Sequence, residues 1–245
     1  MKTAIKAFCC GGFGDGKTFH AGTYPKSIWF STEPAGYETI EMHPELLKNT
    51  VRQAYYIPSP IEDIKEVFKR MEKDIILAHE QFAEGKVETL ILDNMTYLIE
   101  NRWIYINKYE REFTKSGELD TRSMYGKLTR WAYQFTLMCM CSFPGNVVVT
   151  SHIMLENEDA MRKKMGNDNV VPNVLGGFRN TVGGMFSLYM FLDKIVQKGG
   201  GYKYMARVDS STTKKAKNRY NLDPVLENVT YQTITDAINK SKGGV

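Results

Sequence analysis

One stretch near the N-terminus decides the fold: Cys10-Gly11-Gly12-Phe13-Gly14-Asp15-Gly16-Lys17-Thr18. Its spacing, G-x-x-x-x-G-K-T, is the pattern of a phosphate-binding loop. Glycines let successive backbone N–H groups turn inward around an anion. In such a loop Lys17 can reach the terminal phosphates of a nucleoside triphosphate, and the Thr18 hydroxyl can bind Mg²⁺. The predicted nucleotide site consists of Gly11, Gly12, Phe13, Gly14, Asp15, Gly16, Lys17 and Thr18.

The residues on either side of this loop have the pattern that the motif requires. Residues 3–10, Thr-Ala-Ile-Lys-Ala-Phe-Cys-Cys, are typical of a strand, and residues 18–21 can begin a helix. Phosphate-binding loops connect a strand to a helix in this way. The alternative is that the motif is a Gly-rich turn that stands beside a lysine by chance. Asp15 is unusual because it places an acid beside a polyanion.

Strand and helix patterns alternate along the rest of the chain. Strands are expected over 27–31, 53–57, 88–93 and 147–150, and a hairpin over 186–208 with Gly199-Gly200-Gly201 as its turn. Helices are expected from Pro60 to Gly85, from the end of the strand 88–93 to near Phe113, over 123–142 and over 231–240. Polar loops are expected over 114–122, 153–177 and 212–219. This alternation predicts an α/β fold with a mostly parallel central sheet flanked by helices, a C-terminal β-hairpin and one domain over residues 1–245.

The composition is that of an ordinary globular protein. The chain has 245 residues, of which 42% are hydrophobic and 24% charged, and its net charge of +4 is too mild to indicate a nucleic-acid partner by itself. Four cysteines lie in two pairs without metal-ligand spacing, which favours core thiols in a reducing cytoplasm. Lys6 interrupts the short apolar N-terminus, and no segment approaches the roughly 20 apolar residues of a membrane span. We therefore expect a cytoplasmic protein without membrane contact.

Three polar residues follow predicted strands and could complete a triphosphatase site. Asp93 comes directly after the apolar run 90–92, where an acid would hold Mg²⁺ together with Thr18; the alternative is a helix cap. Glu33 and His152 also stand at strand ends, where open α/β sheets bind ligands. Glu33 could activate water and His152 could contact the terminal phosphate. The alternatives are a plain turn residue before Pro34 and a satisfied polar residue at a strand end.

With these residues the chain resembles the RecA-like recombination ATPases, and among them the small phage-encoded proteins associated with single-strand annealing. Ser31-Thr32-Glu33-Pro34-Ala35-Gly36 resembles the family's D-x-E-x-G segment, and Asp93-Asn94-Met95-Thr96-Tyr97-Leu98 resembles its D-S-x-T-x-L segment. Thr150-Ser151-His152 occupies the family's polar sensor position, and Lys217-Asn218-Arg219 resembles its K-x-R segment. Ser31 and Asn94 depart from the family's aspartate and serine, and Asp15 replaces a small residue.

The resemblance implies a RecA-like core that binds ATP and Mg²⁺ and hydrolyses ATP, with Lys17, Glu33 and His152 as catalytic residues. It also implies that Lys217 and Arg219 act on a neighbouring copy in a ring or filament; the alternative is a solvated basic loop. Single-stranded DNA would be bound by two polar loops. Its expected contacts are Lys115 and Arg122 in residues 114–123, and Arg162, Lys163 and Lys164 in residues 153–177.

The expected function is therefore ATP hydrolysis coupled to single-stranded DNA in phage-type recombination or annealing. Two alternatives stay open at the level of sequence. The first is a nucleotide-gated module that binds DNA or protein with little turnover, which the departures at Asp15 and Ser31 would suit. The second is a small-molecule kinase, in which the basic residues near 212–219 would serve as a lid.

Overall fold

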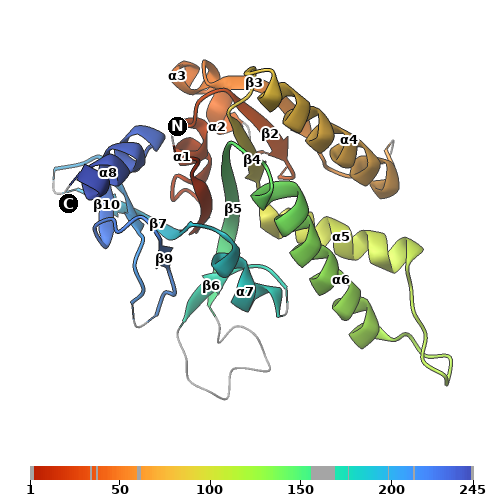
Figure 1. Ribbon diagram of the computed structural model, residues 1–245. Helices are drawn as coiled ribbons and strands as arrows, with labels where there is room; N and C mark the ends of the chain where they lie inside the picture. Colours follow the sequence, from red (N-terminus) through yellow and green to blue (C-terminus); the bar gives the residue numbers. More distant parts are fainter. Residues whose placement is uncertain are drawn as a thin grey trace.

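The structure, a computed structural model, describes residues 3–33, 35–36, 38–59, 62–155, 169–175, 177–197, 199–211 and 213–243. A twisted sheet runs through its middle, and helices lie on both of its faces (Figure 1). The strands are β1 (Lys6–Gly11), β2 (Ser27–Ser31), β3 (Thr50–Tyr55), β4 (Thr89–Asp93), β5 (Asn146–Leu155), β6 (Val170–Pro172), β7 (Leu188–Val196), β8 (Tyr202–Arg207), β9 (Lys217–Asn218) and β10 (Val225–Glu227). The helices are α1 (Lys17–Gly22), α2 (Glu38–Glu41), α3 (Pro44–Leu47), α4 (Ile64–Ala83), α5 (Met95–Tyr109), α6 (Thr121–Phe135), α7 (Phe178–Met185) and α8 (Tyr231–Gly243), and the π-helical turn η1 (Thr136–Cys141) continues α6.

The order of strands in the sheet is β10-β8-β7-β1-β5-β4-β2-β3. From β7 to β3 all neighbours are parallel, whereas β8 and β10 add antiparallel pairs at one edge. The predicted α/β class, mostly parallel sheet and C-terminal hairpin are confirmed. This order places β1 between β5 and β7, so the loop after β1 opens at the middle of the carboxyl edge.

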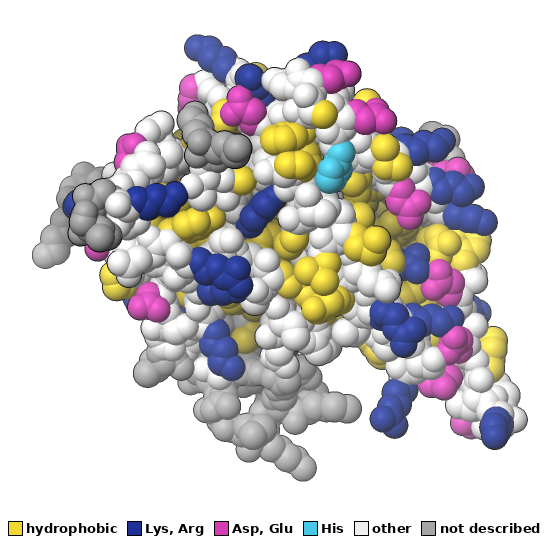
Figure 2. Space-filling model, viewed as in Figure 1, with side chains coloured by type: hydrophobic (Ala, Val, Ile, Leu, Met, Phe, Trp, Pro, Cys, Tyr) yellow, Lys and Arg dark blue, Asp and Glu magenta, His cyan; other side chains and the backbone are white. Residues whose placement is uncertain are grey.

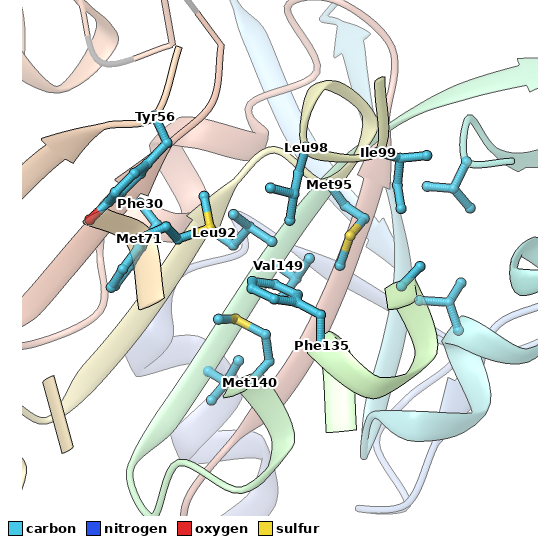
Figure 3. Packing of buried hydrophobic residues seen from close by; sticks show 14 of the residues in the cluster. Phe30, Tyr56, Met71, Leu92, Met95, Leu98, Ile99, Phe135, Met140 and Val149 are labelled. Carbon is cyan, nitrogen blue, oxygen red and sulfur yellow. The ribbon is translucent and has the colours of Figure 1, made fainter. Parts of the chain in front are cut away.

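The two faces of the sheet carry separate cores, because side chains alternate along each strand. Phe8 and Cys10 of β1 pack on the face covered by α4, α5, α6 and α7, whereas Ala7 and Cys9 pack on the face of α1 and α8. Figure 3 shows the first of these cores, in which Phe30, Leu92 and Val149 from three strands meet side chains of the covering helices. The four cysteines are free, as expected.

Two predicted helices have different ends in the structure. The helix expected from Pro60 begins at Ile64, because the Asp63 carboxylate accepts the N–H of Lys65 at 2.8 Å and caps the first turn. The helix expected over 123–142 begins earlier, at Thr121, behind an Asp120 cap. Its last part widens into η1, where the Thr136 hydroxyl donates to the carbonyl of residue 132.

Two predicted loops are partly strand, which corrects the sequence interpretation. Within 153–177, β5 continues to Leu155 and β6 pairs with it antiparallel, and within 212–219, β9 pairs with β7. Strands of two or three residues are too short to show an alternation. The sequence also gave no indication of α7, because Gly183 and Gly184 interrupt its pattern; Gly183 is required there, since a Cβ would lie 2.2 Å from the Tyr189 ring.

Candidate nucleotide-binding site

The phosphate-binding loop connects the central strand β1 to helix α1. Gly14 and Gly16 have φ angles of 78° and 83°, which is the left-handed region that favours glycine. Gly16 is restricted further, because a Cβ there would lie 2.7 Å from a ring carbon of Tyr204. A Cβ on Gly14 meets nothing within 4 Å among the described residues, so the loop leaves open space on that side. The conformation is a cradle that only glycines can build.

The loop's charged side chains are held by its own backbone. Lys17 Nζ donates to the carbonyl oxygens of Gly11 at 3.0 Å and Gly12 at 2.6 Å, and the side chain is buried. Burial lowers the pKa of Lys17, and the nearby carboxylate of Asp93 opposes this. The Asp15 carboxylate accepts the N–H of Gly12 at 2.6 Å. The unusual acid thus occupies a backbone donor that would otherwise face an anion.

Thr18 and Asp93 meet although they lie far apart in the sequence. Thr18 Oγ1 donates to Asp93 Oδ2 at 2.9 Å, and the Thr150 hydroxyl donates to the other carboxylate oxygen. Asp93 is buried, and burial raises the pKa of its carboxyl group. A hydroxyl and a carboxylate are oxygen ligands of the kind that Mg²⁺ prefers, alongside substrate phosphates. These two residues fit the predicted metal role. The described part of the chain has no group of three or more His, Cys, Asp or Glu side chains that could hold a metal ion by themselves.

The contacts of Asn94 distinguish between the two predicted roles of Asp93, a Mg²⁺ ligand and a helix cap. Its side-chain oxygen accepts the N–H of Tyr97 at 3.0 Å, so Asn94, and not Asp93, caps α5. The peptide bond between the two residues is cis. The alternative role of Asp93 as a helix cap is therefore wrong, and its carboxylate faces Thr18 instead.

Glu33 and His152 are joined through Asn94, although His152 lies within β5 opposite Gly11 and not at a strand end as predicted. Asn94 Nδ2 donates to Glu33 Oε2 at 2.5 Å and lies 3.2 Å from His152 Nε2. His152 Nε2 lies 3.5 Å from the same Glu33 oxygen, and this contact lowers the pKa of the glutamate carboxyl. Glu33 is consequently ionised near neutral pH and can accept a hydrogen bond from water. The role of Asn94 was not predicted, because no sequence pattern indicates that an asparagine after a strand will contact two residues far away in the chain.

A cavity of about 320 Å³ brings these groups together. It is lined by Phe13, Gly14, Gly16, Lys17, Thr18, Phe19, Glu33, Ala35, Gly36, Thr39, His43, His152, Lys194 and Tyr204. The Phe13 ring, 81% exposed, lies 4.4 Å from the His152 ring between centroids. Lys194 and Tyr204 were not predicted as site residues. They come from the β7–β8 hairpin, which reaches this edge because β7 pairs with β1.

The remaining predicted site residues lie elsewhere. Lys217 Nζ donates to the carbonyl of Gly184 at 2.5 Å and lines a different cavity, and neither Lys217 nor Arg219 lines the nucleotide cavity of its own chain. Lys115 is exposed in the loop after α5, and Arg122 is exposed in the first turn of α6. Arg162, Lys163 and Lys164 lie outside the described residues. None of the helices described has the length and apolar character needed to span a bilayer.

Comparisons with solved structures return ATPases of bacterial secretion systems. A prototypical ATPase from the type III secretion system of pathogenic bacteria has a TM-score of 0.46 and 14% identity, over 77% of this chain and 51% of that one. The assembled ATPase EscN from the enteropathogenic E. coli type III secretion system has a TM-score of 0.47 and 14% identity, over 78% of this chain and 43% of that one. The chain thus spans about half the length of these proteins. No curated protein matches it.

The family comparison covers most of the chain and includes the loop, Glu33, Asp93 and His152. Residues 3–220 match the AAA domain family. The chain therefore belongs to the AAA domain family of P-loop ATPases.

Proposed function

We propose that this protein binds ATP with Mg²⁺, hydrolyses it, and couples hydrolysis to single-stranded DNA as part of a homo-oligomer. One observation carries the enzymatic part. Lys17, the Thr18–Asp93 pair and the ionised Glu33 line or border a single cavity at the carboxyl edge of the sheet. Hydrolysis needs these three kinds of group together: a cation for the phosphates, oxygen ligands for the metal, and a base or water-orienting carboxylate.

Each residue has a defined task in this proposal. Lys17 exchanges its two carbonyl contacts for the oxygens of the terminal phosphates. Glu33, released from Asn94, orients water for in-line attack and holds its proton. His152, whose Nε2 lies 3.5 Å from Glu33 Oε2 and 3.2 Å from Asn94 Nδ2, contacts the terminal phosphate. Mg²⁺, when bound by Thr18 and Asp93, would neutralise charge on the phosphates.

The second candidate is a nucleotide-gated module with little turnover, and Asp15 favours it. Its carboxylate accepts the Gly12 N–H, so an incoming phosphate must displace an internal anion from the loop. Glu33 likewise accepts a hydrogen bond from Asn94 at 2.5 Å, which holds it away from water. Both contacts would slow a first turnover in the isolated chain. Hydrolysis that starts only on assembly would reconcile the two candidates.

Assembly is proposed because two expected cations do not reach the cavity of their own chain. Lys217 and Arg219 line no part of it, and the Arg219 side chain is exposed. In the proposal they complete the cavity of a neighbouring copy and stabilise charge on the transferred phosphate. Arg219→Ala should then retain ATP binding and lose assembly-dependent hydrolysis. Turnover equal to that of the unmodified protein would refute the role in trans.

A phosphate-release assay with ATP and Mg²⁺, with and without single-stranded DNA, tests the proposed function. Stimulation by DNA is the expected result and fits a role in phage-type recombination or annealing. Tight ATP binding without release would favour the gated module. Formation of ADP that depends on a small phosphate acceptor, without release of free phosphate, would identify a kinase and overturn the proposal.

A further inference from the structure

Helix α6 has a glycine in its interior that none of the described residues explains. Gly126 is exposed in the middle of Thr121–Phe135, and a Cβ there would meet nothing within 4 Å among the described residues. Glycine in a helix interior costs about 1 kcal/mol relative to alanine. By contrast, Gly183 of α7 is in contact with the Tyr189 ring. The space above Gly126 is free for a group from outside the chain to approach the helix backbone.

Two arginines flank this glycine on the same side of the helix. Arg122 and Arg130 are four residues before and after Gly126, about one turn away in each direction, which places them roughly 12 Å apart along the axis. Both are exposed, and neither has an ion-pair partner among the described residues. From Thr121 to Cys141 the helix contains no aspartate or glutamate. The helix therefore presents two unneutralised cations beside its gap.

The other charged groups at this face are already satisfied. Lys127 pairs with Glu112 at 2.5 Å, and the Ser123 hydroxyl donates to the same carboxylate. Asp120 accepts the N–H of Ser123 at 3.0 Å as the helix cap. These residues, with Arg122, Gly126 and Arg130, line a shallow cavity of about 490 Å³. Figure 2 shows Lys and Arg side chains gathered over this end of the α5–α6 pair, at the lower right.

Exposed aromatic rings stand beside the cations. Tyr125 is 45% exposed and stacks on Trp103, with ring centroids 4.4 Å apart and planes 13° apart. Tyr133, 44% exposed, follows about one turn after Arg130. Cations that follow a phosphate backbone, combined with aromatic rings on which bases stack, are the features of proteins that bind single strands without sequence preference. An acidic protein segment would need the arginines but not the tyrosines.

We propose that the exposed face of α6 binds single-stranded nucleic acid, with the sugar-phosphate backbone crossing the helix at Gly126. Arg122 and Arg130 contact phosphates on either side, and Tyr125 and Tyr133 stack on bases. The class of partner rests on the proposed function, but this contact requires neither ATP nor hydrolysis. The site extends the expected contact of Arg122 from the 114–123 loop along about three further turns of helix.

Fluorescence anisotropy of a labelled oligothymidylate tests this face without reference to catalysis. Gly126→Gln fills the gap with a good helix former, so its melting temperature should equal or exceed that of the unmodified protein while affinity falls about tenfold. Arg122→Gln with Arg130→Gln should weaken binding at low salt and reduce the slope of log K against log salt by about 2. Lys73→Gln, at an exposed position on α4, is the matched control and should change neither quantity.

The tyrosines are tested with an oligonucleotide that lacks bases. Tyr125→Ala with Tyr133→Ala should weaken binding of oligothymidylate and leave binding of the abasic strand unchanged. The proposal is overturned if Gly126→Gln binds oligothymidylate as tightly as the unmodified protein and with the same salt dependence. It is also overturned if the variant loses binding of polyglutamate but keeps binding of DNA, because the face would then be a protein-docking surface. If the unmodified protein binds oligothymidylate through this face but releases no phosphate from ATP, the proposed ATPase activity is refuted and this inference stands.

Discussion

Gly16 in the nucleotide loop and Gly126 on α6 represent two different kinds of site in one molecule. Gly16 has a left-handed φ and stands against the Tyr204 ring, so the fold itself requires it. Gly126 is helical and exposed, and no described residue requires it. The nucleotide cavity is likewise built from side chains that already have hydrogen-bond partners, whereas Arg122 and Arg130 of α6 have no ion-pair partner in the part of the chain that the structure describes. The first region is organised for one compact ligand, and the second suits an extended, flexible polyanion.

The largest expected effect is on phosphate release, in a variant that should leave DNA binding by α6 unchanged. Glu33→Gln removes the carboxylate that would orient water but keeps a side chain that can contact Asn94. We expect the rate of phosphate release to fall by about 10²–10³, with ATP affinity nearly unchanged. Oligothymidylate affinity measured without ATP should not change. A variant that releases phosphate at the original rate would remove Glu33 from the mechanism.

The two glycines themselves should respond in opposite directions to alanine. Gly16→Ala combines an unfavourable φ with a clash against Tyr204, and should lower the free energy of unfolding by about 2–4 kcal/mol. Gly126→Ala should raise it by up to about 1 kcal/mol. Urea denaturation measures both changes. Adding Tyr204→Ala to Gly16→Ala should recover the steric part alone, and equal losses for both glycines would contradict the contrast.

Substitution of Asp15, in the phosphate-binding loop, should have a smaller effect. Asp15→Ala frees the Gly12 N–H and removes a negative charge beside the phosphates, so ATP affinity should rise by about tenfold. Asp15→Asn keeps a neutral acceptor and should give an intermediate increase. Isothermal titration with ATP and Mg²⁺ checks both variants. A drop in affinity for each would mean that the carboxylate organises the loop for binding.

The fold could be predicted from the sequence because its main signals are local. The loop at residues 10–18 has a fixed spacing, and the apolar runs of β1, β2, β4 and β5 alternate with helices, which is enough for a parallel sheet. The first residues of α4 and α6 differ from the predicted ones because side-chain caps at Asp63 and Asp120 decide where these helices begin. Strands β6 and β9 are too short to carry a periodic pattern.

The candidate site was predictable only where its residues follow strands. Glu33 and Asp93 stand at the carboxyl ends of β2 and β4, and His152 lies within β5 opposite Gly11, the last residue of β1. Parallel pairing brings these positions to one edge, so their meeting follows from the sheet order. Lys194 and Tyr204 enter through the β7–β8 hairpin, and their approach depends on β7 pairing with β1, which no local pattern indicates. A role for Gly126 could not be predicted, because a single glycine in a helical pattern does not indicate whether the space around it is filled or open.

All of the proposed chemistry requires that the glycine loop at residues 11–18 holds a triphosphate, with Lys17 bonding the phosphates. Equilibrium titration with labelled ATP and Mg²⁺ tests it most directly, with Lys17→Ala as the comparison. Binding should be saturable, and Lys17→Ala should weaken it by at least about 100-fold while the melting temperature changes little. Equal affinity in the two proteins, or no binding in either, would contradict it.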